Sequence, residues 1–332
     1  MSADRELALL SVVAPVYQEE ATIEAFCTAV ADALSGLPFE LILVDDGSTD
    51  ETRTKLEQLA AADNRIKLIM LSRNFGHQAA ITAGLDHASG NVAVTLDSDL
   101  QDPPSLILEL LERWRSGADV VYAVRRHRDG ESRLKLWSAG LFYKLFRALA
   151  AVSLEANTGD FRLLDRRALN ALRSMRERSR FLRGMSIWVG YRQDSVAYDR
   201  DARYAGETKF TLARMLRFSL DAIASFSYRP LQLATLLGFA ISSIAFVAIP
   251  VVIVLKLTGH YLSGFSTVEI TMLLLGGIQL ITIGVIGEYV GRIFEEVKDR
   301  PLYLIRSRRN FTEGTGPNPA YEEAAADFDS ER

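Results

Sequence analysis

A cluster of acidic residues directly follows a short apolar run in the first half of the sequence. The run Val92–Leu96 is short and rich in β-branched residues, which is typical of a buried strand, and Asp97, Asp99 and Asp102 come after it. Ligands of an open parallel sheet bind at the carboxyl ends of its strands, so we expect these acids to face a ligand crevice. If the strand continued, Asp97 and Asp99 would share one face, and two carboxylates that close need a proton or a cation between them. Mg²⁺ or Mn²⁺ is a hard cation that suits such oxygen ligands. Aspartate, serine and proline also mark loops, so this segment by itself is equally compatible with a polar turn.

Polar residues also follow two earlier apolar runs. The segment Pro15–Glu19 follows the first of them, and Asp45–Ser48 follows the second, so three polar groups would face one crevice. Apolar runs alternate with helix-like stretches, which predicts an α/β fold with a doubly wound, mostly parallel sheet. The predicted strands are Leu9–Ala14, Leu41–Val44, Lys67–Leu71, Val92–Leu96 and Val120–Val124.

Two local signals predict helix ends. Ser48 and Glu51 have the spacing of a capping box, which would place the start of a helix at this point. Gly90 follows a helix-like stretch and suits a helix C-terminus.

Two long uncharged segments lie near the C-terminus. Pro230–Leu255 and Ile270–Gly287 contain no ionisable side chain. At a rise of 1.5 Å per residue they would reach about 39 and about 27 Å as helices, against a hydrocarbon core of roughly 30 Å. We therefore expect two transmembrane helices. The alternative is a pair of core helices in a soluble enzyme, although core helices rarely run so long without a charge.

The distribution of basic residues predicts the orientation of these segments. The connection between them holds only Lys256 and His260, whereas their outer flanks are rich in arginine and lysine. By the positive-inside rule, the N-terminal domain and both termini lie in the cytoplasm, in a multi-pass protein of the inner (plasma) membrane. The first residues, Met1–Glu6, are mixed in charge and do not have the pattern of a cleaved signal peptide.

The chain divides into four predicted regions. Residues 1–208 form the cytosolic α/β domain, and residues 209–229 form an amphipathic juxtamembrane helix whose apolar and basic residues fall on opposite faces. Residues 230–292 hold the two spans, and residues 293–332 form a cytosolic tail whose polar end we expect to be disordered. Packing of this amphipathic helix on its own domain is the alternative to a position in the membrane interface.

Composition excludes two classes of function. A net charge of −4, without a block of alternating basic and aromatic residues, does not favour nucleic acid as a partner. Cys27 is the only cysteine, which excludes an intramolecular disulfide and a thiolate zinc site, and we expect it to be buried.

Several segments of the sequence resemble motifs of a known family. Three of them resemble the nucleotide-sugar-binding motifs of the family 2 inverting glycosyltransferases with a GT-A (Rossmann-like) fold, namely Val13–Glu19, Val44–Ser48 and Leu96–Asp99. Four more, with the two-span C-terminus, resemble the polyprenyl-phosphate hexosyltransferases, relatives of dolichol-phosphate mannose synthase: Leu71–Gly76, Asp99–Pro104, Thr158–Leu163 and Arg203–Lys209. The resemblance runs from about Leu9 to Ile305. Its one small departure is Gln18, which stands where asparagine is usual and keeps an amide.

The resemblance implies roles for the residues at the strand ends. Asp99 and Gln101, with Asp97 beside them, would ligate Mg²⁺ or Mn²⁺, which neutralises the diphosphate leaving group. The residues that would bind the nucleotide sugar are Pro15, Tyr17, Glu19, Asp46, Asp97 and Ser98. For Asp46, formation of a turn with Gly47 is the alternative.

The acceptor side carries basic residues and one further acid. Arg125 and Arg133 are the candidates for the acceptor phosphate, and Arg203 and Lys209 for donor or acceptor phosphate, although solvated surface charge is the alternative for each. Asp160 is the catalytic base candidate that the resemblance implies. A phosphomonoester with a second pKa near 6 is already largely a dianion at neutral pH, so Asp160 is also a candidate positioning group. We expect His77, His87 and His127 to be structural, because they lack metal-ligand spacing.

Together these features predict a metal-dependent, membrane-anchored glycosyltransferase for cell-envelope glycosylation. It would transfer a hexose from a nucleotide sugar to polyprenyl phosphate (undecaprenyl or similar) at the cytoplasmic membrane face, with inversion. The resemblance makes UDP-glucose the first donor candidate, followed by GDP-mannose and UDP-N-acetylglucosamine. Two alternatives are a nucleotidyltransferase, for which no glycine-rich phosphate loop is found, and a non-catalytic membrane-anchored nucleotide-binding or lipid-translocating protein. The pair Gly287 and Gly291 would allow close packing in a homo-oligomer.

Overall fold

A mixed sheet forms the centre of the N-terminal domain. The computed structural model describes residues 5–126, 158–199, 229–259 and 265–311. Within these residues the sheet has eight strands in the order β7-β5-β6-β4-β1-β2-β3-β8. All strands point the same way except β6 and β8, which are antiparallel to their neighbours. The strands are β1 (Leu10–Val16), β2 (Phe39–Asp45), β3 (Ile66–Leu71), β4 (Val92–Thr95), β5 (Val120–Arg125), β6 (Thr158–Asp165), β7 (Gln193–Tyr198) and β8 (Ile305–Arg309).

This sheet confirms the predicted α/β fold with a mostly parallel sheet. The five predicted strands are β1 to β5, whereas β6, β7 and β8 were not predicted. Strand β6 inserts between β4 and β5 and runs against both of them. Its residue Asp160 therefore enters the sheet beside the acidic segment that follows β4.

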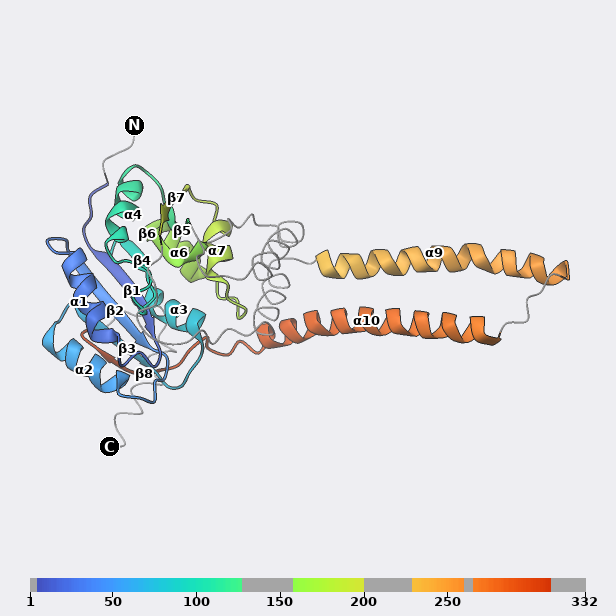
Figure 1. Cartoon of the computed structure of the whole chain (residues 1–332), viewed down its shortest axis with the longest axis horizontal. Helices are drawn as coiled ribbons and strands as arrows, with labels where there is room; N and C mark the ends of the chain where they lie inside the picture. The colour runs from blue at the N-terminus through green and yellow to red at the C-terminus, as the bar shows by residue number, and fades with distance from the viewer. Residues whose placement is uncertain (1–4, 127–157, 200–228, 260–264, 312–332) are drawn as a thin grey trace.

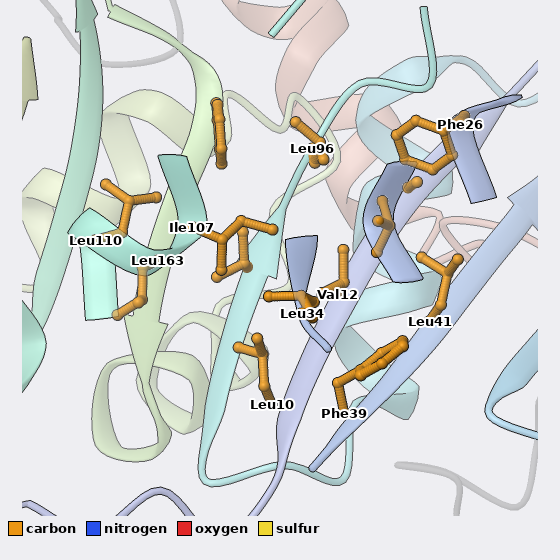
Figure 2. Packing of buried hydrophobic residues seen from close by; sticks show 14 of the residues in the cluster. Leu10, Val12, Phe26, Leu34, Phe39, Leu41, Leu96, Ile107, Leu110 and Leu163 are labelled. Carbon is orange, nitrogen blue, oxygen red and sulfur yellow. The ribbon is translucent and has the colours of Figure 1, made fainter. Parts of the chain in front are cut away.

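Helices cover both faces of the sheet (Figure 1). One hydrophobic cluster joins β1 to the helices α1, α2 and α4, and a second cluster joins the other side of the same strand to α3, α6 and α7. Figure 2 shows part of the first cluster, which includes Leu10 and Val12 of β1, Phe26 of α1, and Ile107 and Leu110 of α4. The helices of the domain are α1 (Ile23–Ala33), α2 (Thr52–Ala62), α3 (His77–His87), α4 (Leu106–Arg115), α6 (Arg166–Ser174) and α7 (Leu182–Trp188).

Strand β1 is buried along its whole length because both of its faces are covered. Its side chains alternate between the two clusters, with Val12 in the first and Val13 in the second. Helix α3 packs especially close to it, since a Cβ atom added to Gly84 would lie 2.3 Å from Cγ1 of Val13. This close packing fixes the position of α3, whose first residue faces the pocket described below.

Two long helices project from the domain side by side (Figure 1). They are α9 (Arg229–Leu257) and α10 (Phe265–Val297), and each contains a segment long and apolar enough to cross a membrane, Ala234–Leu255 and Leu274–Val297. Large apolar side chains on them are exposed, for example Phe246 at 79% and Leu280 at 72%. Both helices predicted from the uncharged segments are therefore present, and exposure of their apolar side chains sets them apart from core helices. The predicted amphipathic helix at 209–229 lies outside the described residues, apart from Arg229.

After α10 the chain returns to the domain. Strand β8 pairs with the edge strand β3, and Tyr303 before it is fully buried, with its hydroxyl donating to Asp86 Oδ2 at 2.8 Å. Asn310 after it donates to the carbonyl oxygens of Ala60 and Ile66 at 2.6 and 2.8 Å. The segment predicted as the start of a tail thus includes a strand of the sheet.

Both predicted helix-end signals were wrong. Helix α2 begins at Thr52, and Ser48 is instead held between two loops: its backbone N–H donates to Asp45 Oδ1 at 3.0 Å, and its Oγ accepts from the Gln18 N–H at 3.0 Å. Helix α3 ends at His87, before Gly90. Gly90 is required for packing, because a Cβ atom there would lie 2.3 Å from the carbonyl oxygen of Leu9. Cys27 is buried as predicted, and this burial raises the pKa of its thiol to about 12.

A buried carboxylate ties the amino ends of the central strands together. Glu40 on β2 accepts hydrogen bonds from the hydroxyl of Ser11 at 2.5 Å and from the backbone N–H and hydroxyl of Ser89, both at 2.7 Å. It also pairs with Lys67 on β3. Burial by itself would raise the pKa of Glu40, but the hydrogen bonds from Lys67, Ser11 and Ser89 outweigh it and lower the pKa.

A lowered pKa makes the contribution of Glu40 to stability depend on pH. The contribution is present above the ordinary glutamate pKa and is lost as the pH falls through the lowered pKa of the folded state. We expect Glu40→Gln to reduce the free energy of unfolding by about 2 kcal/mol at pH 7.5, because charge-assisted hydrogen bonds are lost. The difference from the unaltered protein should shrink below about pH 4. Thermal unfolding in detergent measures both, with Glu57→Gln on the exposed face of α2 as the control. A difference that stays constant with pH would refute the assignment.

Candidate active site

A pocket of about 340 Å³ lies at the carboxyl ends of β1, β2 and β4. Parallel strands that end at one edge bring their following loops together there, which is the ligand position in open α/β sheets. The pocket brings together the six residues predicted to bind a nucleotide sugar and Asp99, a predicted metal ligand. These residues are far apart in the sequence, since Pro15 and Asp99 are separated by 84 positions. Its lining residues are Pro15, Val16, Tyr17, Glu19, Asp46, Asn74, Gly76, His77, Ala80, Asp97, Ser98 and Asp99.

Asp46 connects the loop after β2 to the start of α3. Its carboxylate oxygens accept hydrogen bonds from the backbone N–H groups of Phe75 and Gly76, at 2.7 and 2.9 Å. Burial raises the pKa of Asp46, and these two backbone hydrogen bonds oppose the rise. Gly47 follows with φ +76°, and a Cβ atom there would lie 2.7 Å from backbone atoms of Arg73 and Asn74, so only glycine permits this approach. Asp46 thus lines the pocket and also holds the loop before α3 through its carboxylate, while Gly47 follows it in the left-handed region.

The N-terminus of α3 forms another wall of the pocket. Gly76 is its N-cap residue with φ +99°, and Gly76, His77 and Ala80 all line the pocket. The first N–H groups of a helix lack partners within the helix, and the helix dipole favours negative charge at this end. This wall is therefore suited to the phosphate groups of a ligand.

The acidic segment after β4 forms a tight turn. Strand β4 ends at Thr95, so the expectation that Asp97 and Asp99 share one face of a continuing strand was wrong. Leu100 adopts φ +60°, which is unusual for a residue with a side chain, and Asp99 Oδ1 accepts the backbone N–H of Gln101 at 3.1 Å. Ser98 donates its hydroxyl to the carbonyl oxygen of Pro15 at 2.9 Å, which ties this turn to β1. Asp97 and Asp99 are brought into one pocket by the turn and not by a strand.

Asp97 in this turn has a carboxylate oxygen without a hydrogen bond in the described structure. Its Oδ1 is buried and has no hydrogen-bond partner among the described residues, although Nε2 of His77 lies 3.5 Å away. Burial raises the pKa of Asp97 to about 6, and the charge of His77 opposes part of that rise. A carboxylate in this situation is stabilised by any cation that enters the pocket.

The residues at this turn suit a divalent cation whose remaining coordination positions are filled by a bound substrate. No group of three or more His, Cys, Asp or Glu side chains in the described parts of the chain is arranged to hold a metal ion alone. Mg²⁺ is commonly held by one or two carboxylates together with substrate phosphates, and Asp97 and Asp99 supply such a pair next to the N-terminus of α3. Gln101, the third predicted ligand, is buried in the same turn.

Asp160 on β6 is held by a bidentate ion pair. The guanidinium of Arg183 on α7 donates from Nε to Oδ1 and from Nη2 to Oδ2, both at 2.9 Å. Nε2 of His77 lies 3.3 Å from Oδ2. Burial would raise the pKa of Asp160, but the charge of Arg183 and the hydrogen bonds from His77 and Arg183 lower it well below its ordinary value. A carboxylate this acidic is a poor proton acceptor, which favours the positioning role that was left open for Asp160 over the role of base.

Arg125 is anchored by two neighbours close to the same site. Its Nη2 lies 3.3 Å from Asp102 Oδ2, and its Nε donates to the hydroxyl of Tyr198 at 3.1 Å. Tyr198 in turn donates to Asp102 Oδ1 at 2.5 Å. Nη2 of Arg125 would lie 3.1 Å from a Cβ atom at Gly159, so the guanidinium sits directly over the residue before Asp160. The three other predicted phosphate ligands, Arg133, Arg203 and Lys209, lie outside the described residues.

Sequence reasoning missed two residues of this site. His77 was predicted to be structural, but it lines the pocket and contacts Asp97 and Asp160. Its position directly after Gly76, at the start of a helix that faces the strand ends, was the available signal. Arg183 had no such signal, because α7 lies far along the chain and meets β6 only through the fold. His87 is buried, with Nδ1 2.8 Å from the carbonyl oxygen of Ala83, as expected of a structural histidine, whereas His127 lies outside the described residues.

Comparisons with known proteins agree on one family. A family model described as "Glycosyl transferase family 2" matches residues 11–173. The chain is 45% identical over 299 residues to the uncharacterized glycosyltransferase YkcC of Bacillus subtilis (strain 168), covering 89% of this chain and 93% of that protein. It is 40% identical over 300 residues to the SfII prophage-derived bactoprenol glucosyl transferase of Shigella flexneri, covering 90% of this chain and 97% of that protein.

A solved structure is also similar. Glucosyl-3-phosphoglycerate synthase from Mycobacterium tuberculosis, in complex with Mn²⁺, UDP and phosphoglyceric acid, aligns with a TM-score of 0.47 at 23% identity. The alignment covers 65% of this chain and 76% of that chain.

The ion pair between Asp160 and Arg183 predicts a non-additive effect on stability. Arg183→Ala would leave a buried carboxylate without its main counter-charge, so we expect the free energy of unfolding to fall by about 3 kcal/mol. Adding Asp160→Asn removes the stranded charge and should restore at least about 1 kcal/mol of that loss. Denaturant unfolding in detergent measures these values. Arg126→Ala, which breaks an exposed pair with Asp199, is the control and should cost under about 0.5 kcal/mol. A double variant less stable than Arg183→Ala would contradict this account.

Proposed function

Since this chain belongs to glycosyltransferase family 2, we propose that it transfers glucose from UDP-glucose to a polyprenyl phosphate at the cytoplasmic face of the membrane. The observation that carries the proposal is the 40% identity with a protein named bactoprenol glucosyl transferase, which extends over 90% of this chain. A second relative of the same name, from Shigella phage SfX, is 39% identical over 90% of this chain. The pocket supports the proposal because its walls suit a nucleotide diphosphate.

The donor would occupy the pocket between β1, β2 and α3. Asp46 and Glu19 offer carboxylate oxygens that suit ribose hydroxyls or a base N–H, and the exposed Tyr17 offers an aromatic face. The N-terminus of α3 would stabilise the diphosphate. Asp97 and Asp99, with Gln101 beside them, would hold Mg²⁺ or Mn²⁺. When bound, this cation neutralises negative charge on the leaving nucleoside diphosphate.

The acceptor phosphate would approach from the side of β5 and β6. Arg125, at the carboxyl end of β5 and over Gly159, is placed to attract the phosphate dianion, and Asp102 and Tyr198 fix its guanidinium. A phosphate oxygen would attack the anomeric carbon from the face opposite the diphosphate. The new carbon–oxygen bond forms as the bond to the diphosphate breaks, so the configuration inverts. No base has to remove a proton from a dianion, in agreement with the low pKa of Asp160.

The two long helices would anchor this reaction at the membrane. The chain leaves the domain after β7, forms α9 and α10, and returns to the same sheet as β8, so both ends of the helix pair are on the side of the domain. The basic residues on the outer flanks of the two spans favour a cytoplasmic position for that side under the positive-inside rule. This supports an inner-membrane protein with two spans, a cytoplasmic catalytic domain and cytoplasmic termini. In this arrangement β8 belongs to the catalytic unit together with residues 1–208.

Self-association is a further part of the proposal. Cβ atoms added to Gly287 and Gly291 on α10 would meet no atom within 4 Å in the described chain. A second α10 helix is able to approach closely along such a surface, which is the basis for a homo-oligomer in the membrane.

Substitution of Asp99 tests the proposed chemistry. Purified protein with Mn²⁺, undecaprenyl phosphate and labelled UDP-glucose should form labelled polyprenyl-phosphate sugar. Asp99→Asn should lower the turnover at least about 100-fold, because charge on the leaving group is no longer neutralised. Asp63→Asn, which removes a carboxylate in the loop before β3, is the control and should leave turnover unchanged. Turnover of Asp99→Asn within about threefold of the unaltered protein would remove the basis of the metal assignment.

The same assay with a panel of donors decides the sugar and the class of function. GDP-mannose and UDP-N-acetylglucosamine are the competing donors, and transfer from one of them alone would correct the donor while keeping the chemistry. Absence of transfer from every donor would instead support a non-catalytic nucleotide-binding or lipid-translocating protein.

Accessibility of engineered cysteines tests the topology. Cys27 is the only native cysteine and is buried, so it gives little background. A membrane-impermeant maleimide applied to spheroplasts should label Thr258→Cys, at the end of α9 remote from the domain. Glu57→Cys on α2 should be labelled only after lysis. The reverse pattern would show that the domain lies outside the cytoplasm.

A further inference from the structure

One imidazole nitrogen lies between the two carboxylates that have different predicted roles. Nε2 of His77 is 3.5 Å from Asp97 Oδ1 and 3.3 Å from Asp160 Oδ2. Asp97 belongs to the donor and cation side of the pocket, and Asp160 lies on β6, on the acceptor side. His77 is therefore the contact between the two sides.

The two carboxylates differ in how firmly they are held. Arg183 fixes both oxygens of Asp160 with hydrogen bonds of 2.9 Å, and Gln78 adds a longer one of 3.4 Å. In contrast, Asp97 Oδ1 is buried without a hydrogen-bond partner among the described residues, and the nearest basic side chain there is His77. Of the two carboxylates that contact His77, Asp160 is thus the one held in place by other residues, and the position of Asp97 depends on His77.

The backbone also fixes His77. It is the first residue of α3, and the preceding Gly76 N–H donates to Asp46 Oδ2 at 2.9 Å. Further along α3, Gly84 packs directly against Val13 of β1. The backbone that carries the imidazole is therefore held in place at both ends of α3, and the imidazole lies between the two carboxylates.

We propose that His77 is a positioning residue that couples Asp97 on the donor side to Asp160 on the acceptor side of the pocket. The inference rests on the proposed transfer to a lipid phosphate. Correct spacing between donor and acceptor matters most while the reaction occurs, so loss of this contact lowers kcat more than it changes the KM for the donor. A histidine that only completed the fold of α3 would instead act through stability.

Kinetics of three variants separate these roles. His77→Ala removes the contact and is expected to lower kcat about 30-fold or more, with the donor KM changed less than about threefold. His77→Gln supplies an amide N–H that reaches one carboxylate and should recover about tenfold of that loss. His87→Gln alters the other end of the same helix, away from the pocket, and should leave kcat per folded molecule unchanged. A kcat of His77→Ala within twofold of the unaltered protein overturns the proposal, and so does a His77→Gln variant as slow as His77→Ala.

A binding measurement keeps the inference distinct from the proposed reaction. Without Asp160 as a partner, His77 pairs fully with Asp97 and competes with a cation there. Asp160→Asn should therefore weaken binding of Mn²⁺ in the presence of UDP about fivefold, measured by electron paramagnetic resonance of free Mn²⁺. In the His77→Ala background the same change should have less than a twofold effect. If Asp160→Asn weakens Mn²⁺ binding only when His77 is present, but the protein transfers no sugar, the proposed function is refuted and the positioning role is kept. If His77 makes no difference to this effect, or if Mn²⁺ does not bind, the positioning role is overturned.

Discussion

The site depends on the neutralisation of carboxylates that the fold gathers at one edge of the sheet. Asp46 follows β2, Asp97 and Asp102 follow β4, and Asp160 lies on β6, so they come from three segments. Each carboxylate loses hydration in the fold, which costs free energy unless a partner compensates. Backbone N–H groups of the loop before α3 compensate Asp46, Arg125 and Tyr198 compensate Asp102, and Arg183 compensates Asp160. Of these four carboxylates, only Asp97 keeps a buried oxygen without a hydrogen bond among the described residues, and this is the feature on which the proposed cation site rests.

Each compensating contact also connects parts of the chain that are distant in sequence. The hydrogen bonds of Asp46 hold the N-terminus of α3 against the pocket, and Arg183 brings α7 onto β6. The same contacts that stabilise buried charge therefore determine the shape of the site. This explains why His77, a residue without a motif of its own, lies at the centre of the pocket.

The helix pair α9 and α10 is connected to the sheet domain at both of its ends. Strand β8 and the buried Tyr303 fix the end of α10 to β3 and to Asp86 on α3. Because α3 also carries Gly76 and His77 at its other end, one helix links the end of α10 to the pocket. In the proposed function, this arrangement would bring a lipid phosphate and a soluble nucleotide sugar to the same domain.

The sequence by itself determined the parts of the structure that depend on local pattern. Short β-branched runs predicted the five strands from β1 to β5, because a strand that is buried on both faces is apolar along its whole length. Long uncharged segments predicted α9 and α10, because a helix that crosses a membrane needs about 20 apolar residues in a row. Motifs at the strand ends predicted seven pocket residues, since parallel strands bring their carboxyl ends together. The tertiary structure alone decided the insertion of β6, the return of β8, the partners of Asp160 and the place of His77. Those features depend on which distant segments pack together. The partner of a buried charge is the opposite charge that the fold brings close to it, and the local spacing of residues in the sequence does not show which residue that is.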